Sequence, residues 1–239
     1  MIKTVFILIH VIVNVTIMLP IGIVAMLLSF LGMSRIMSAV IYRIAQIWSL
    51  QLLKLIGCTV TVTGRENIPM SGGACFVSNH GSIFDIVLLA AYCGRPIGFI
   101  AKKGLVLIPV LNVWIFLLGG LFIDRKNIRK ARNTINKGID RIKAGGGMVI
   151  FPEGRRSRGQ GLLPFHPGSL KLATQAQAPI VPVAISGSYD LFEKNMRIRP
   201  VPVKVNFCKP IYTEEIPPED RKIVLCDRVY AVIKEQLDS

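Results

Sequence analysis

The sequence predicts an α/β protein in which a mixed, mostly parallel sheet is covered by helices and preceded by a hydrophobic segment. The first observation is a change of pattern near residue 58, before which the chain is almost continuously apolar. The second is an alternation of short apolar strands with amphipathic helices after that point. The third is a set of polar residues at strand ends, where α/β sheets bind their ligands. We therefore divide the chain into a two-helix hydrophobic segment over 1–57 and an α/β domain over 58–239.

The composition points away from an ordinary secreted or disulfide-stabilised domain. Hydrophobic residues make up 51% of the 239 residues, and the mean hydropathy of +0.52 is above the usual range. The five cysteines are scattered and form no C-x-x-C pair, which argues against a disulfide framework or a zinc site. The net charge is +15, and basic residues gather between residues 125 and 158. A field of this sign attracts phosphates of nucleic acids, anionic lipids or phosphorylated substrates.

The N-terminal segment has the composition of a helix that contacts lipid. Residues 4–31 carry no charge. As one helix they would reach roughly 42 Å, enough to cross about 30 Å of hydrocarbon. Pro20 is expected to kink or break this helix. A second apolar stretch, 36–57, places its few polar residues on one side, which is typical of a helix lying in a membrane interface.

We therefore expect a two-helix anchor that enters a membrane from one side. A single crossing by the first helix is the alternative within this interpretation. Two core helices of a soluble bundle are the alternative outside it. A signal peptide fits poorly, because the start carries one lysine and no small-residue cleavage site precedes a polar mature sequence.

The chain after residue 57 alternates between strand and helix patterns. We expect strands at 58–64, 74–78, 96–101, 120–124, 147–151, 179–185 and 202–207. We expect helices at 83–92, 105–118, 127–144, 168–177 and 219–237. This order predicts a parallel or mixed sheet with both faces covered.

The stretch NHGSIFD, residues 79–85, places one of the three histidines in a turn before a helix. In a catalytic interpretation, Asp85 accepts a hydrogen bond from one imidazole nitrogen of His80, so that the other nitrogen can take a proton. In a structural interpretation, Ser82 and Asp85 form a capping box at the start of the helix. This interpretation does not explain His80. The motif alone leaves both interpretations open.

Three further segments place notable residues at strand ends. GGLFIDR, residues 119–125, ends on Arg125, and FPEGRRS, residues 151–157, contains Arg156. IVPV, residues 180–183, is the last of the three. A solvated surface charge is the ordinary interpretation of either arginine alone. Two such strand ends beside a histidine-bearing one favour a phosphate site, because guanidinium groups bind phosphate oxygens in bidentate fashion.

In these blocks the sequence resembles the 1-acyl-glycerol-3-phosphate (lysophosphatidic acid) acyltransferases and related glycerolipid acyltransferases. That family shares N-H-x-x-x-x-D, G-x-x-F-I-D-R, F-P-E-G-T-R-S and V-P-V blocks in this order. The resemblance runs from about residue 55 to 190. Arg155 departs from the pattern, because threonine is usual there, and it adds a charge beside Arg156. The departure bears on the head-group contacts and not on the class of enzyme.

The resemblance implies a reaction and a set of site residues. His80, held by Asp85, would deprotonate the sn-2 hydroxyl of 1-acyl-glycerol 3-phosphate. The oxygen would attack the thioester of acyl-CoA or acyl carrier protein without an acyl-enzyme, giving phosphatidic acid for phospholipid biosynthesis. No metal or other cofactor is implied. The substrate-binding residues implied are Glu153 and Gly154 at the glycerol, and Arg125, Arg156 and Lys102 at the phosphate, with Lys103 as the alternative to Lys102.

Other classes of protein explain less of the sequence. A serine hydrolase would need a G-x-S-x-G elbow, and a metalloenzyme would need more ligands than three scattered histidines. The glycines at 145–147 precede a strand, so they are not a dinucleotide loop. A basic nucleic-acid-binding protein fits the charge of +15 but not the histidine motif or the apolar N-terminus, so we expect no nucleic-acid partner. Among acyltransferases, glycerol 3-phosphate or another lysolipid stays open as the acceptor.

The expected substrates also indicate where the protein works. A lysophospholipid has its tail in the bilayer, whereas a thioester carrier arrives from water. An enzyme that joins them should lie on the membrane phospholipid surface. We therefore expect a membrane-associated protein at the cytoplasmic face of the inner membrane.

Overall fold

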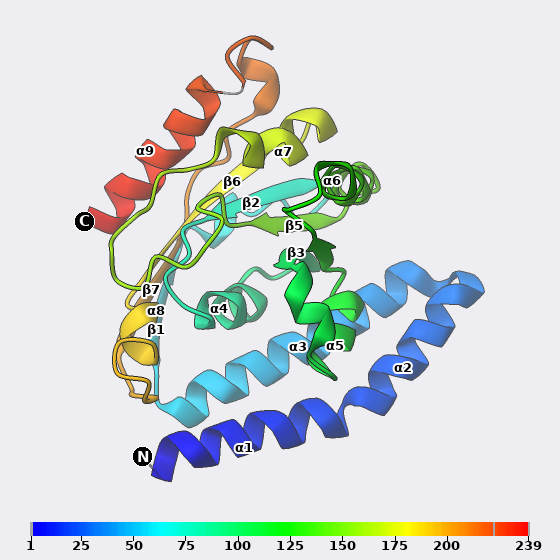
Figure 1. The fold of residues 1–239 in the computed structure, drawn as a ribbon, viewed down its shortest axis with the longest axis vertical. Coiled ribbons are helices and arrows are strands. Elements are labelled where there is room, and N and C mark those ends of the chain that lie inside the picture. Colours follow the sequence, from blue (N-terminus) through cyan, green and yellow to red (C-terminus); the bar gives the residue numbers. More distant parts are fainter. Residues whose placement is uncertain (1, 222, 239) are drawn as a thin grey trace.

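The structure is a computed structural model that describes residues 2–221 and 223–238. The expected α/β fold is confirmed, because the described residues form a seven-stranded sheet in the order β1-β7-β6-β2-β5-β3-β4 (Figure 1). Neighbouring strands are parallel except β6 and β7, which are antiparallel. The strands are β1 (Thr59–Thr63), β2 (Ala74–Ser78), β3 (Ile97–Lys102), β4 (Leu121–Ile123), β5 (Gly147–Ile150), β6 (Ile180–Ser186) and β7 (Pro202–Phe207).

Helices cover both faces of this sheet (Figure 1). On β2, Cys75 and Val77 face a core shared with α6, α7 and α9, whereas Ala74 and Phe76 face a core shared with α3 and α4. All of β2 is therefore buried, as expected for a strand covered on both faces. The α-helices are α1 (Ile2–Ile17), α2 (Leu19–Leu28), α3 (Ser34–Ile56), α4 (Phe84–Tyr92), α5 (Leu111–Leu117), α6 (Ile128–Lys143), α7 (Lys171–Ala176), α8 (Ser188–Leu191) and α9 (Val224–Asp238).

The N-terminal segment is a bent helix followed by a helix that returns beneath the domain (Figure 1). The helix ends at Ile17 and restarts at Leu19, with Pro20 in the first turn of α2, where a missing N–H does no harm. A π-helical turn, Ser29–Met33, links α2 to α3. Among the described residues, Ile2–Leu28 and Ile36–Ile56 are long and apolar enough to cross a membrane, and 11% and 44% of their apolar windows are buried.

The helix α3 packs on the α/β domain. Leu52, Leu53 and Ile56 belong to the same core as β2 and α4. Gln46, one of the polar residues expected on the stripe of this helix, is buried and donates from Nε2 to the carbonyl of Ala91 at 3.1 Å. The expected boundary at residue 57 coincides with the end of α3. Because residues on both sides of this boundary share one core, the division into two domains stays a prediction.

The helix expected over 105–118 differs most from the structure, while the one expected over 219–237 begins only at Val224. The stretch 105–118 starts within a 3-10 turn, Lys103–Leu107, which is followed by the short helix α5. The break falls at Ile108 and Pro109, where Ile108 is extended with φ −92° and ψ 106°. A proline cannot donate to the helix and disfavours helical geometry in the residue before it, which explains the interruption.

Candidate active site

The five strands β6, β2, β5, β3 and β4 run in the same direction, so their carboxyl ends meet at one edge of the sheet. Asn79 follows β2 and extends its pairing with β6 through its side chain. Its Oδ1 accepts from the N–H of Ile185, and its Nδ2 donates to the carbonyl of Ile185, each at 2.8 Å. The side chain thereby fixes the start of the turn that carries His80.

His80 and Asp85 meet in the structure. The distance between His80 Nδ1 and Asp85 Oδ2 is 2.8 Å, and the Asp85 side chain is fully buried. The imidazole stacks on Phe151, with ring centroids 4.0 Å apart and an interplanar angle of 17°. No described residue makes a hydrogen bond to Nε2 of His80. The ring is therefore oriented by a carboxylate on one side and leaves one nitrogen for a substrate.

Asp85 also binds the turn that precedes α4, so the contacts expected from the structural and from the catalytic interpretation are both present. The same Oδ2 accepts from the backbone N–H of Ser82 at 2.9 Å. Ser82 Oγ in turn accepts from the N–H of Phe84 at 3.1 Å. The start of α4 and the orientation of the imidazole thus depend on one carboxylate oxygen.

Glu153 lies beneath the histidine turn and is buried. Its Oε1 accepts from the backbone N–H of His80 at 2.6 Å, and its Oε2 accepts from the N–H of Leu163 at 3.0 Å. Burial raises the pKa of the Glu153 carboxyl from its ordinary value. Both oxygens are occupied by backbone groups, so in this structure Glu153 positions the loop around His80.

Gly154 and Arg125 lie in contact. Arg125 donates from Nη1 to the carbonyl of Gly154. Gly154 has φ +71°, and a Cβ there would lie 3.0 Å from the Arg125 guanidinium and 3.1 Å from the ring of His166. Glycine is required at this position both by the left-handed backbone and by the space that the two side chains occupy.

The remaining cations predicted for the site differ in their partners. Arg156 pairs with Glu193 at 3.0 Å. Lys103 pairs with Asp124 at 2.9 Å, whereas Lys102 is exposed at the end of β3 and has no ion-pair partner among the described residues. The structure therefore leaves Lys102 freer for a phosphate than its alternative Lys103.

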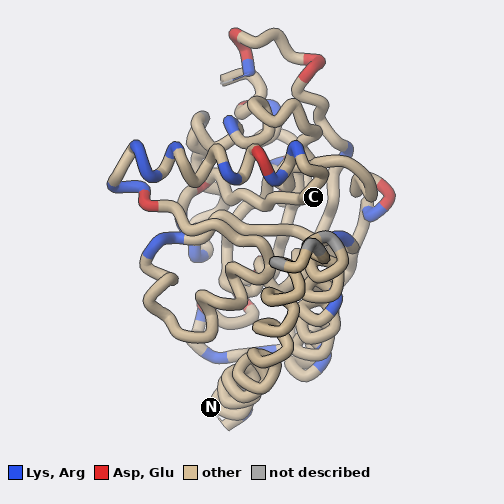
Figure 2. Tube along the Cα trace, turned by 90° about the vertical axis from the view of Figure 1, so that its right-hand side faces the viewer, with Lys and Arg blue, Asp and Glu red and all other residues tan. Residues whose placement is uncertain are grey.

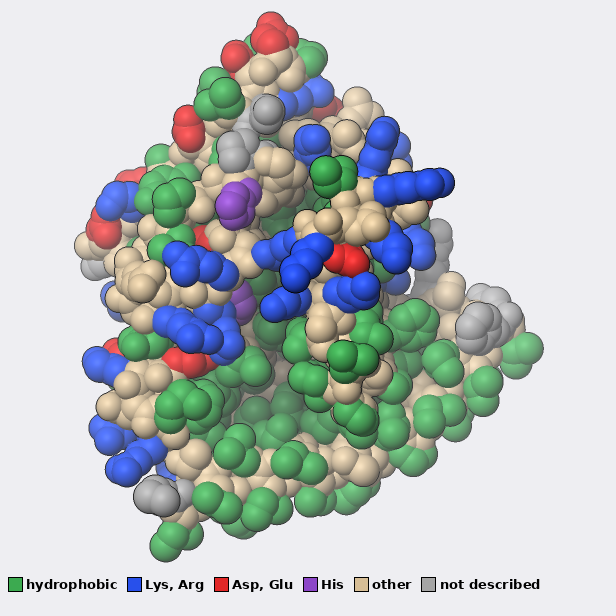
Figure 3. Space-filling model, viewed as in Figure 1, with side chains coloured by type: hydrophobic (Ala, Val, Ile, Leu, Met, Phe, Trp, Pro, Cys, Tyr) green, Lys and Arg blue, Asp and Glu red, His purple; other side chains and the backbone are tan. Residues whose placement is uncertain are grey.

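The site edge is basic, and the N-terminal helices below it are apolar. Figure 3 shows Lys and Arg side chains gathered across the middle of the molecule, above a broad hydrophobic surface in the region of α1, α2 and α5. In the turned view of Figure 2, the segment that starts at the N-terminus carries almost no charged residues. This distribution places cations beside a surface suited to lipid.

Glu193 is a site residue that the sequence interpretation missed. Its Oε2 accepts from Ser82 Oγ at 2.6 Å, and its Oε1 accepts from the N–H of Ile83 at 2.7 Å and from Arg156. With Arg156, Tyr189 and others it lines a pocket of about 230 Å³. No local motif marks this residue, because its partners are 37 to 111 positions away in the chain.

Comparison with known proteins shows similarity to acyltransferases. The acyltransferase family model matches residues 59–186. The 1-acyl-sn-glycerol-3-phosphate acyltransferases of Borreliella burgdorferi and Cocos nucifera are 33% and 34% identical over 60% and 69% of this chain. The Escherichia coli protein of the same name is 36% identical over 57% of this chain. The matches cover 58%, 53% and 56% of these relatives, so the chain matches little more than half of their length.

A solved structure is similar over nearly the whole chain. It is the crystal structure of the 1-acyl-sn-glycerophosphate (LPA) acyltransferase from Thermotoga maritima, with a TM-score of 0.82 and 26% identity. The similarity covers 99% of this chain and 95% of that one. It therefore includes the N-terminal helices as well as the sheet.

We expect Glu193→Ala to destabilise the protein, because it leaves the N–H of Ile83 and the hydroxyl of Ser82 without an acceptor. The loss should be about 1–3 kcal/mol in the free energy of unfolding, measured by chemical denaturation in detergent. The matched control is Glu214→Ala, since Glu214 is exposed and such changes usually stay within about 0.5 kcal/mol. Equal values for the two variants would show that the Glu193 contacts do not stabilise the turn.

Proposed function

Because the chain belongs to the acyltransferase family, we propose that it moves a fatty acyl chain from an acyl thioester to the sn-2 hydroxyl of 1-acyl-glycerol 3-phosphate. The product is phosphatidic acid, and the thioester is acyl-CoA or acyl carrier protein. The observation that carries this proposal is the 2.8 Å contact between His80 Nδ1 and the buried Asp85 carboxylate, at the edge where parallel strands end. The names of the relatives and of the solved structure refer to this acceptor, which supports the same assignment.

His80 acts as the general base. Asp85 accepts the Nδ1–H, which leaves Nε2 unprotonated and facing the acceptor hydroxyl. Nε2 takes the hydroxyl proton while the oxygen attacks the thioester carbonyl carbon. The carbon–sulfur bond then breaks, the acyl group stays on the glycerol oxygen, and the departing thiolate receives the proton from the imidazolium. Asp85 stabilises that imidazolium, because its own charge is buried beside the ring.

Phosphate recognition is assigned to the cations at the same edge. A phosphate monoester carries about −1.5 to −2 charge near neutral pH. Arg125 and Lys102 are exposed at the ends of neighbouring strands β4 and β3. Arg156 engages Glu193 through Nη1, and the rest of its guanidinium fork can donate to phosphate oxygens. Gly154, in contact with Arg125, and Glu153 beneath His80 are assigned to the wall beside the glycerol.

The N-terminal helices are assigned to a one-sided membrane anchor at the cytoplasmic face of the inner membrane. The bent helix α1–α2 exposes apolar side chains such as Ile12 and Ile17, at 66% and 63%. The same surface extends to Leu107 and Phe116, which are 84% and 56% exposed. Burying such side chains in a bilayer is favourable by about 25 cal/mol per Å² of apolar area.

Contacts along α1 favour insertion from one side over a crossing. Thr4 Oγ1 accepts from the N–H of Ile198 at 3.1 Å, and Trp114 donates from Nε1 to the carbonyl of Val15 at 2.9 Å. Ile7, between these points, is buried in the core that contains β2. A helix attached to the domain near both ends lies along it, which supports insertion from one side.

We expect His80→Ala to lose at least about two orders of magnitude in turnover, because a positioned general base contributes roughly 10²–10⁴-fold. Asp85→Asn should lose less, with part of its effect arising from the start of α4. Turnover is followed as thiol release in detergent, with a panel of acceptors that includes glycerol 3-phosphate and other lysolipids, and with each thioester donor. His10→Ala, in α1, is the matched control. A folded His80→Ala protein with near wild-type turnover would refute the mechanism.

Arg125→Met and Arg156→Met should weaken capture of the phosphorylated acceptor more than capture of the donor. Loss of a charge-assisted hydrogen bond commonly costs about 1.5–3 kcal/mol, which is roughly a 10- to 150-fold increase in the acceptor KM. The control is Arg129→Met, because Arg129 is an exposed arginine of α6. If KM rises equally for acceptor and donor, the arginines have a structural role instead.

The anchor is tested by fractionating cells in low and high salt. The full-length protein should stay with membranes in high salt, because apolar burial is not screened by ions. Replacing the exposed Ile9, Ile12 and Ile17 by glutamine should release a larger share of the protein. These substitutions are cleaner than removal of residues 1–57, which would also expose the core beneath α3. Full-length protein that is freely soluble without detergent contradicts the anchor.

A further inference from the structure

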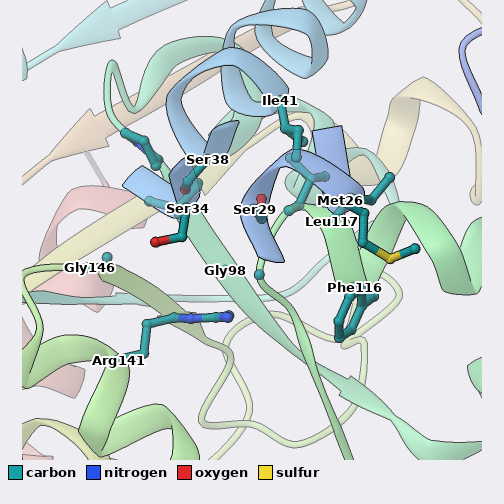
Figure 4. A pocket seen from close by; sticks show the side chains of 15 residues that line it. Met26, Ser29, Ser34, Ser38, Ile41, Gly98, Phe116, Leu117, Arg141 and Gly146 are labelled. Carbon is teal, nitrogen blue, oxygen red and sulfur yellow. The ribbon is translucent and has the colours of Figure 1, made fainter. Parts of the chain in front are cut away.

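Another pocket lies at the edge of the sheet opposite His80 (Figure 4). It has a volume of about 330 Å³ and lies where β3 and β5 begin, at Gly98 and Gly147. Its other walls come from α2, the π-helical turn, α3 and α5, with Arg141 of α6 beside them. His80 follows the carboxyl end of β2, so the sheet separates this pocket from the catalytic residues.

Arg141 brings an unneutralised charge to this pocket. Its Nη1 is buried and has no hydrogen-bond partner among the described residues. Burial also lowers the pKa of its guanidinium from the ordinary value. Arg141 as a whole is only partly buried, but a guanidinium nitrogen that is shielded from solvent and has no partner calls for an explanation such as a bound anion. None of the described residues that line the pocket is acidic.

Two glycines make room for the arginine. A Cβ at Gly119 would lie 2.6 Å from Arg141 Nη1, and a Cβ at Gly146 would lie 2.9 Å from Arg141 Cγ. Any larger side chain at these positions would displace the arginine. Both glycines thus lie against the Arg141 side chain, and Gly119 is in addition required by its left-handed backbone, with φ +78°.

Hydroxyl groups lie across the pocket from the arginine. Ser34 and Ser38 are one turn apart on α3, so they share a face of that helix. Ser29, on the π-helical turn, already donates to the carbonyl of Ala25 at 2.8 Å. Figure 4 shows the Arg141 side chain reaching into the space below Ser34 and Ser29. A guanidinium facing hydroxyl donors is a favourable setting for phosphate oxygens.

The rest of the lining is apolar and continues to the exposed surface of the anchor. Met26 of α2 and Phe116 of α5 line the pocket, and Phe116 is 56% exposed. Neighbouring side chains of α2, Val24 and Leu27, are 55% and 57% exposed. A ligand with a phosphate at Arg141 could therefore extend hydrocarbon chains along Met26 and Phe116 into the bilayer.

We propose that this pocket binds the phosphate of an anionic glycerophospholipid of the membrane through Arg141, Ser34 and Ser38. The bound lipid connects the corner between α2 and α3 to the α/β domain. It thereby sets how the domain sits on the bilayer. This role is separate from the acceptor site, because Arg125 and Arg156 lie at the other edge of the sheet.

The test measures binding, so it does not depend on turnover. Full-length protein in zwitterionic detergent is titrated with phosphatidylglycerol that carries a fluorescent chain. We expect Arg141→Met to weaken binding by about tenfold or more, and the Ser34→Ala, Ser38→Ala double variant by roughly threefold or more. Arg132→Met, an exposed arginine of the same helix, is the matched control and should leave the affinity unchanged.

Further arms of the same experiment distinguish the sources of phosphate. The anionic phosphate of phosphatidylcholine is balanced by choline, so this lipid has no net charge and should bind more weakly than phosphatidylglycerol. Inorganic phosphate should not displace the labelled lipid at comparable concentrations, because it lacks the chains. Displacement at equal concentrations would overturn the lipid assignment in favour of free phosphate. Lipid binding that is the same in wild type and Arg141→Met would overturn the site. If Arg141→Met does not fold, the double serine variant decides the outcome.

Discussion

The buried carboxylate of Asp85 holds together the helix start and the orientation of the His80 ring through a single oxygen. Oδ2 accepts from His80 Nδ1 at 2.8 Å and from the N–H of Ser82 at 2.9 Å. Oδ1 is buried without a hydrogen-bond partner among the described residues, so these two donors on Oδ2 offset the cost of burying the charge. The turn between β2 and α4 must therefore bring both donors to the same point. Asn79 on Ile185 and Glu153 on the His80 N–H hold that turn from two sides.

Acidic and basic side chains differ in their exposure at this edge of the sheet. Asp85, Glu153 and Glu193 are shielded from solvent, and each accepts at least one backbone N–H from the loops around the site. Arg125 and Lys102 are exposed instead. In a chain with a net charge of +15, the carboxylates thus organise the loops, while these two cations face solvent. Such loops are held by fixed dipoles and need little rearrangement when a substrate arrives.

Much of the fold could be predicted because its signals are local. The expected strand at 74–78 coincides with β2, and the helix expected at 127–144 is α6 within a residue at each end. The helix expected over 105–118 was wrong in extent, although Pro109 was visible as the cause. The short helix α8 was missed, because four residues are too few for a period to appear. The packing of α3 into the domain core could not be predicted, because the hydrophobic periodicity of a helix does not show which element its apolar face contacts.

The sequence by itself left the pairing of His80 with Asp85 open between two interpretations, but it determined the order of the main elements and the residue types at the strand ends. These features follow from backbone preferences and from neighbours close along the chain. Only the tertiary structure decided that Glu153 and Glu193 are occupied by backbone donors and that Nη1 of Arg141 is buried without a partner among the described residues. Burial and pairing depend on groups brought together from distant parts of the chain, such as Glu193 and Ser82, which lie 111 positions apart. The free energy of those contacts depends on desolvation and geometry, and neither can be predicted from residues that are adjacent in the chain.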